Sequence, residues 1–339
     1  MPTIAPAYVT VNPSYMVPEL LLNYTQASGA FDLLAKGDML QRLSEGDLLA
    51  YIKRIDVRTR MAAGQAAYNQ LPSASIVMSQ ISTPSYLFRM RAEYDHHDTA
   101  AAARWGVSIV QAQRLAMRQG FAQILRGALL YGMNPANGEG VAYTNGATSL
   151  NLPPDMNGNT TVVTYDNGQM AFFINSQIQN LKTRTNQMGI GKKFTILGPQ
   201  RVLGTFEYNI VQLVQFQRVG AGSTSTAGTV KETLMMNGDQ IDWCYDDTLI
   251  GKGSGNTDLV IIDMPEVSKP EAGWPNTNEF AKLEPGLDAC VMMLCDMAAP
   301  REIPTPLPGG AIDVLSEMRA TSGWAVRGEA VTLISMQFQ

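Results

Sequence analysis

The two histidines of the chain, His96 and His97, are adjacent and lie among the carboxylates of Glu93, Asp95 and Asp98. Imidazole and carboxylate groups together can hold a divalent metal ion. However, neighbours in sequence rarely face the same ion, and no further histidine or Cys-x-x-Cys pair completes a ligand set. Because the cluster precedes a predicted helix, we interpret the acids as capping groups that favour the helix dipole. No metal and no other cofactor is predicted.

Two glycine-rich segments, residues 251–255 and 189–193, invite comparison with phosphate-binding loops. Neither has the G-x-x-x-x-G-K-[ST] spacing that lets backbone N–H groups surround a phosphate, and Asn186 stands where the second segment needs its first glycine. There is no G-x-S-x-G elbow of a serine hydrolase. With two histidines, the commonest general base is nearly absent.

Four aspartates, Asp239, Asp242, Asp246 and Asp247, form two close pairs. Without a nucleophile or base beside them, we interpret them as solvated turns. We therefore predict no catalytic residue and no enzyme activity. A cytoplasmic enzyme with an unrecognised site is kept as an alternative.

Charged residues make up only 16% of the 339 residues, against roughly 25% in soluble domains. Interface cores are depleted in Lys, Asp and Glu, so this deficit favours an obligate assembly over a weakly charged monomer. Residues 53–126 contain ten basic and four acidic residues, whereas residues 231–302 contain five and fourteen. These segments either meet across subunit boundaries or are two solvated faces of one molecule. The net charge of -5 gives no general attraction to nucleic acid.

The three cysteines, Cys244, Cys290 and Cys295, are an odd number, and two of them lie in an apolar run. Buried free thiols are therefore expected in place of a disulfide framework. The first basic residue is Lys36, so no signal peptide is recognised, and the longest apolar run is too short to cross a bilayer. We expect synthesis and retention in a cytoplasm, without membrane contact.

The first ninety residues are predicted to form an extended arm, a helix and two strands. Residues 1–35 combine repeated prolines with many apolar side chains, which is typical of an arm lying on another surface. A helix is predicted near residues 39–49. Residues 55–60 and 86–91 alternate between apolar and polar side chains, which predicts two strands. The long polar segment between them makes this an extended hairpin.

The clearest element is a long helix over residues 98–131, with Asp98 as its N-cap and Gly132 at its end. Its apolar face contains Phe121, Ile124 and Leu125, and Gly106 could mark a bend. A loop follows at residues 132–159. Further predicted helices cover residues 169–187 and 199–207. Predicted strands cover residues 160–165, 194–197, 259–262, 291–294 and 325–338.

Three runs carry a resemblance to a known family. They are residues 64–72 (GQAAYNQLP), 91–98 (RAEYDHHD) and 130–140 (LYGMNPANGEG). Together with the order of the elements, these runs resemble the HK-97-like major capsid proteins of tailed bacteriophages over nearly the whole chain. The resemblance implies an α+β fold with an N-arm, an E-loop hairpin, a long spine helix, a peripheral (P) domain and an axial (A) domain.

The resemblance also implies a division of the chain. Residues 1–45 would be the N-terminal arm, 46–97 the E-loop hairpin and its flanks, and 98–207 the spine helix with part of the P domain. Residues 208–298 would be the A domain, and 299–339 a C-terminal return to the P domain. No lysine occurs in residues 61–85, so the Lys–Asn crosslink that some members make there is not expected.

The function implied is that of a major capsid (head) protein of the virion. It would assemble with itself, as hexamers and pentamers, into an icosahedral shell around packaged double-stranded DNA, without sequence-specific binding. Scaffolding, decoration and portal proteins are implied partners. The alternatives are an encapsulin-type nanocompartment shell and, from another class, a tail-tube or fibre protein. We expect intersubunit contacts from eight arginines: Arg58, Arg60, Arg89, Arg91, Arg104, Arg114, Arg118 and Arg126.

Overall fold

The computed structural model describes residues 29–58, 75–104, 106, 108–187, 189–212, 227–235, 238–267 and 288–339. Two predicted features lie largely outside these ranges: the N-terminal arm up to residue 28, and the hairpin tip at residues 59–74. Arg60 is also outside, and the side chain of Arg58 is not described.

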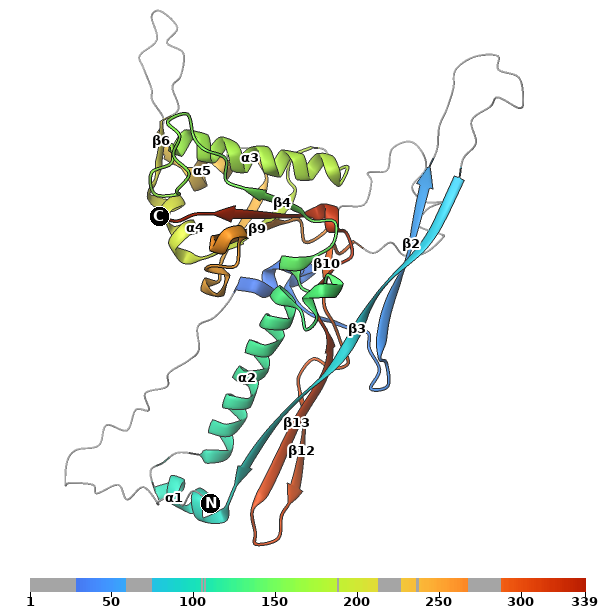
Figure 1. Cartoon of the computed structure of the whole chain (residues 1–339). Helices are drawn as coiled ribbons and strands as arrows, with labels where there is room; N and C mark the ends of the chain where they lie inside the picture. The colour runs from blue at the N-terminus through green and yellow to red at the C-terminus, as the bar shows by residue number, and fades with distance from the viewer. Residues whose placement is uncertain are drawn as a thin grey trace, which may run out of the picture.

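A long sheet of six strands forms the elongated lower part of the molecule and the projecting hairpin (Figure 1). Its order is β1-β11-β13-β3-β2, and β12 also pairs with β13. The strands are β1 (Leu40–Gln41), β2 (Leu49–Arg58), β3 (Ser75–Tyr94), β11 (Leu294–Cys295), β12 (Arg301–Pro306) and β13 (Ile312–Thr321). The predicted hairpin is confirmed as the antiparallel pair β2–β3.

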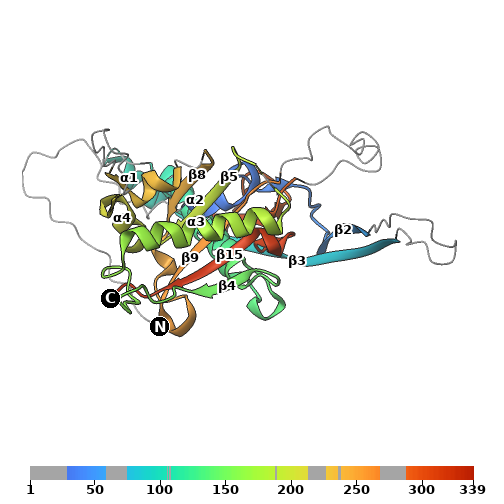
Figure 2. The ribbon, with the colours of Figure 1, turned by 90° about the horizontal axis from the view of Figure 1, so that it is seen from above.

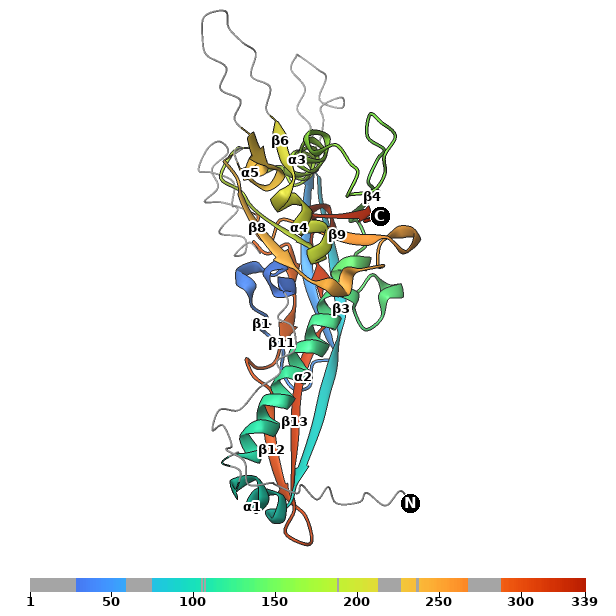
Figure 3. The same ribbon diagram turned by 90° about the vertical axis from the view of Figure 1, so that its left-hand side faces the viewer.

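Along strand β13, buried side chains alternate with partly buried ones. Val314, Met318 and Ala320 are buried, and the last two pack in one core with Phe88 of β3 and with side chains of α2 (Ile109–Tyr131). The helix therefore covers one face of the long sheet, as Figure 3 shows. The intervening side chains of β13 are only partly buried, because a strand directs successive side chains to opposite faces.

The helix predicted over residues 98–131 is not continuous, because it is divided near Gly106, where a bend was expected. The structure has α1 (His96–Arg104) and α2 as separate helices, with Gly106 at a φ of +69° between them. Ser108 starts α2 by accepting a hydrogen bond from the Gln111 N–H. The predicted end at Gly132 is confirmed, since its N–H donates to the Ala128 carbonyl. Ile124, expected on the apolar face, is 44% exposed.

A second sheet, with the order β4-β15-β9-β5-β8, lies beyond the end of α2. Its strands are β4 (Thr148–Asn151), β5 (Lys193–Gly198), β8 (Gln240–Tyr245), β9 (Asp258–Asp263) and β15 (Val331–Met336). Three helices share its core: α3 (Asn167–Arg184), α4 (Gln200–Tyr208) and α5 (Val230–Met235). Figure 2 shows α3 lying across this sheet.

Short elements complete the described chain. The small strand pairs are β6–β7 (Ile210–Gln212 with Ala227–Thr229) and β10–β14 (Val291–Met292 with Trp324–Ala325). The 3-10 turns are η1 (Gly29–Leu33), η2 (Ala35–Gly37), η4 (Pro135–Asn137), η5 (Val141–Tyr143), η6 (Asp247–Leu249), η7 (Ser254–Asn256) and η8 (Gly328–Ala330).

The sheets cut across the predicted division of the chain. A boundary at residues 207/208 separates β5 from its sheet neighbours β8 and β9. Residues 299–339 were expected to return to the P domain, but β15 within them pairs with β9 in the second sheet. The predicted helix at residues 39–49 is wrong, because β1 and the start of β2 lie there. Residues 160–165 form turns with a single bridge at Thr161.

Most other local predictions are confirmed. The helices predicted at residues 169–187 and 199–207 are α3 and α4, and the strand at residues 259–262 is β9. All three cysteines are free and buried. Among the described residues, the helices are too short or too polar to cross a lipid bilayer.

Asp263, the last residue of β9, is fully buried between its cross-strand neighbours Thr195 and Val331. Neither of its carboxylate oxygens has a hydrogen-bond partner among the described residues. Burial raises the pKa of Asp263 well above its usual value, and the positive charge of Lys193 opposes this only in part. A buried carboxyl group without a partner is costly when ionised.

The pH dependence follows from this raised pKa. The folded chain keeps the Asp263 proton to higher pH than the unfolded chain, so stability is lost as pH rises from about 4 through the folded pKa. We expect Asp263→Asn to raise the thermal unfolding midpoint, by an amount that grows between pH 4 and pH 8. Asp242→Asn, at an exposed position of β8, is the control. Parallel midpoint-versus-pH curves for wild type and Asp263→Asn would contradict this account.

Candidate functional site

The face of the long sheet turned away from α2 carries charged side chains. Residues 301 of β12, 317 of β13 and 89 of β3 are direct cross-strand neighbours, which places Arg301, Glu317 and Arg89 in one row. Opposite charges directly across a sheet attract each other. The row therefore alternates positive, negative, positive, at a surface that α2 does not cover.

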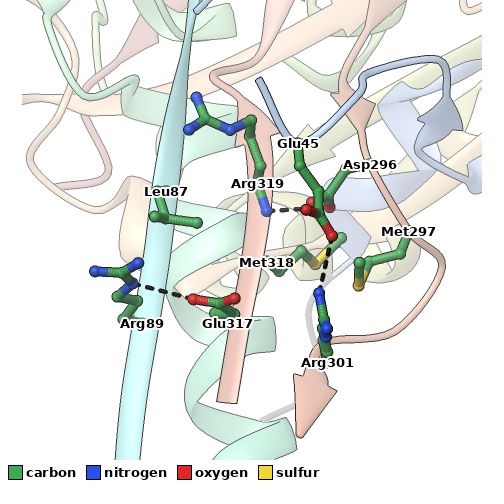
Figure 4. Close-up of a pocket in the computed structure, with 9 residues that line it drawn as sticks. All are labelled: Glu45, Leu87, Arg89, Asp296, Met297, Arg301, Glu317, Met318 and Arg319. Atoms are coloured by element: carbon green, nitrogen blue, oxygen red, sulfur yellow. Dashed lines mark hydrogen bonds and ion pairs between the residues drawn. The ribbon is translucent and has the colours of Figure 1, made fainter. Parts of the chain in front are cut away.

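This row is part of a charged pocket of about 270 Å³, lined by Glu45, Leu87, Arg89, Asp296, Met297, Arg301, Glu317, Met318 and Arg319 (Figure 4). Arg89 Nε lies 3.2 Å from Glu317 Oε2. Arg301 Nη1 lies 2.9 Å from Glu45 Oε1. The backbone N–H of Arg319 donates to Asp296 Oδ1 at 3.1 Å. The charged pocket thus joins the turn before β2 to the strands β3, β12 and β13.

The side chains of the charged pocket can exchange partners. Arg89 is 59% exposed, Arg301 52% and Glu45 72%. Ion pairs between such exposed groups contribute about 0–1 kcal/mol each. Breaking one to form a similar pair with another protein therefore costs little. Three guanidinium and three carboxylate groups suit an ionic contact surface.

Four of the predicted contact arginines have acids of their own chain beside them. Arg91 Nε lies 2.8 Å from Asp313 Oδ1, and this hydrogen bond raises the pKa of Arg91. Arg114 Nε lies 3.0 Å from Glu302 Oε2. The other pairs are Arg89 with Glu317 and, at 4.0 Å, Arg126 with the buried Asp246. A role between subunits stays a prediction for these four.

Arg104 and Arg118 differ from them. Both side chains are exposed, and within the described ranges neither has an ion-pair partner. Arg118 lies on a face of α2 that also exposes Gln111, Leu115 and Ala122. The spacing of these four residues places them along one side of the helix. This side of α2 is open to a partner.

A buried carboxylate lies in the loop that follows α2. Glu139 is 5% exposed and accepts hydrogen bonds from the Tyr86 hydroxyl, the Ser322 hydroxyl and the Asn134 N–H, each at 3.0 Å. Burial of Tyr86 and the hydrogen bond from its hydroxyl to Glu139 raise the pKa of Tyr86 to about 12. We call this set of four residues the junction. It connects β3, the loop after α2 and the turn after β13.

The acidic pairs and the histidine cluster also differ from expectation. Asp239 and Asp246 are buried, so the interpretation of solvated turns is wrong for them. Asp239 Oδ2 lies 2.5 Å from Lys182 Nζ, and Asp246 Oδ1 accepts a hydrogen bond from the Thr248 N–H at 2.9 Å. The side chains of Asp95, His96 and His97 do converge, with one ligand atom from each within 4.8 Å of the others.

Sequence reasoning missed most of the pocket and the junction. Glu45, Asp296, Arg301, Glu317 and Arg319 were not named as candidates, nor was Glu139. The alternation of residues 312–321 was a usable signal for β13. No pattern in the sequence pairs β13 with β3, which lies more than two hundred residues earlier.

The sequence matches no protein-family model and no curated protein. Solved structures do match. The capsid of Myoviridae phage XM1 is similar with a TM-score of 0.65 at 10% identity, over 95% of this chain and 96% of that chain. The capsid of an empty GTA particle is similar with a TM-score of 0.58 at 9% identity, over 96% of this chain and 95% of that chain. The capsid of cyanophage P-SCSP1u gives 0.55 at 11% identity, over 95% and 92%.

Proposed function

Since the chain has the α+β, HK-97-like fold of phage capsid subunits, we propose that it is the major capsid (head) protein of a tailed bacteriophage. It assembles with itself, as hexamers and pentamers, into the icosahedral shell that encloses packaged double-stranded DNA. The protein is a structural component of the virion, made in the cytoplasm of a bacterial host, and it is not an enzyme. Scaffolding, decoration and portal proteins are its proposed partners.

The observation that carries this proposal is structural similarity along almost the full length of both chains. The projecting hairpin β2–β3 and the exposed charged pocket are consistent with it. A hairpin that leaves the body of the subunit needs another surface to cover its exposed apolar side chains, which include Leu49, Tyr51 and Met78. A neighbouring subunit would supply that surface.

We further propose a revised division of the chain that follows the sheets. The long sheet with α1 and α2 corresponds to the P domain and spine, and the hairpin β2–β3 to the E-loop. The second sheet with α3, α4 and α5 corresponds to the A domain.

Electron microscopy of the protein, expressed alone and with its neighbouring genes, tests the function. Closed icosahedral shells, or sheets and tubes of hexamers, are expected. Shells filled with one host enzyme would instead indicate an encapsulin, and rods would indicate a tail-tube protein. A monodisperse small oligomer under both conditions would overturn the proposal.

Reversing the charge of single arginines on α2 distinguishes contacts between subunits from contacts within one subunit. Arg118→Glu breaks no described ion pair, so we expect the free energy of unfolding to change by less than about 0.5 kcal/mol. The yield of particles should fall severalfold. Arg114→Glu loses the Glu302 pair, and adding Glu302→Arg restores an opposite-charge pair. Particle yield by sedimentation and unfolding of the unassembled subunit are measured together. Normal yield with Arg118→Glu would remove this residue from the contact set.

A further inference from the structure

The start of α1 holds the two histidines in an arrangement that their adjacency alone does not predict. Successive side chains on a helix usually diverge, yet the ring centroids of His96 and His97 lie 3.9 Å apart. The carboxylate of Asp95 is close to both, since one ligand atom from each of the three residues lies within 4.8 Å of the others. The objection that neighbours in sequence rarely face the same ion does not apply here.

The hydrogen bonding of His96 suits metal coordination. Its Nδ1 lies 2.5 Å from Asp95 Oδ1. An ion that displaces the proton shared by these two atoms can bind His96 Nδ1 and Asp95 Oδ1 together, because metal ligands bind in their deprotonated form. Gly310, in the turn between β12 and β13, lies close to this ring, since a Cβ added there would be 3.3 Å from His96 Nδ1.

Charge near the site offsets the helix dipole. The N-terminus of α1 carries partial positive charge, which opposes a cation. Asp95 precedes the helix and Asp98 lies in its first turn, so two carboxylates surround the histidines. Nitrogen ligands with a carboxylate favour Zn²⁺, Ni²⁺ or Cu²⁺ over Mg²⁺ and Ca²⁺.

We propose that Asp95, His96 and His97 form a binding site for one divalent transition-metal ion. The side chains of His96 and His97 are exposed, so water or a donor from a second chain completes the coordination. None of the nine residues of α1 is buried, and the ion would therefore stabilise a helix that packing stabilises little. This proposal rests on the described residues and not on the capsid function.

Zinc titration of the protein without an affinity tag tests the site. Isothermal calorimetry with ZnCl₂ is expected to give one ion per chain. His96→Ala and His97→Ala should each weaken binding at least tenfold, which corresponds to about 1.4 kcal/mol. Glu93→Gln, which changes a carboxylate of β3 that pairs with Arg91, is the control and should bind within about twofold of wild type.

A second readout reports on the helix itself. Amide hydrogen exchange in α1 should slow when Zn²⁺ is added to wild type and stay unchanged in the double variant His96→Ala/His97→Ala. The chain has no other histidine, so zinc binding by the double variant with wild-type affinity would assign the ion elsewhere and overturn the proposal. Absence of binding by wild type at about 1 mM Zn²⁺, a free energy near -4 kcal/mol, would overturn it as well.

Discussion

Gly140→Ala is expected to lower the free energy of unfolding by about 3 kcal/mol, through backbone strain and overpacking together. Gly140 has a φ of +85°, a conformation that residues with a Cβ rarely adopt. An added Cβ would lie 2.3 Å from the carbonyl carbon of Tyr131. The change would push Glu139 away from the end of α2 and disturb the junction.

The measurement is thermal or urea unfolding of the unassembled subunit. Gly127→Ala, in the last third of α2, is a matched control, because among the described residues no atom outside the neighbouring helix backbone lies within 4 Å of the added Cβ. Glycine in a helix costs about 0.5–1 kcal/mol relative to alanine, so the control should be neutral or stabilising. If Gly140→Ala were as stable as Gly127→Ala, the junction would not have the tight packing described above.

Asp239→Ala is expected to destabilise the subunit by about 3–5 kcal/mol, because it leaves a buried charge without its partner. The side chains of Lys182 and Asp239 are 6% and 2% exposed, and their charged atoms are 2.5 Å apart. Lys182 Nζ also donates to the Gly189 carbonyl at 2.9 Å. The pair connects the end of α3 to the segment before β8.

A comparable ion pair lies at the surface of the second sheet. Lys193 and Asp242 are about half exposed and lie 3.1 Å apart. Asp242→Ala should therefore cost at most about 1 kcal/mol. Urea unfolding of both variants gives the comparison. Equal effects of the two substitutions would mean that water reaches the Lys182–Asp239 pair and that burial does not set its energy.

Local elements of this fold were predictable wherever neighbouring residues determine them. The end of α2 at Gly132, the helix α3 and the strand β9 follow from caps and from apolar spacing within a few residues. The order of these elements, with three short runs, was sufficient for the family resemblance. Similarity to solved capsid structures confirms the fold that the resemblance implied.

The sites depended on contacts that the sequence does not specify. The charged pocket needs β13 to pair with β3 across more than two hundred residues, and many registers have similar local patterns. Arginines expected to find acids on a neighbour find Glu302, Asp313 and Glu317 in their own chain. The domain boundary predicted at residue 207 separates β5 from β8, which pair in one sheet, because a sheet assembles strands from distant segments.

By itself, the sequence determined the type of most elements, the low charge and the absence of a recognisable catalytic motif. Only the tertiary structure decided which charges are buried. Asp239 and Asp242 are three residues apart, yet one is enclosed beside Lys182 and the other faces solvent. The energy of a carboxylate depends on the water and the partner charges around it. Those surroundings come from chain segments that meet only when the sheets form.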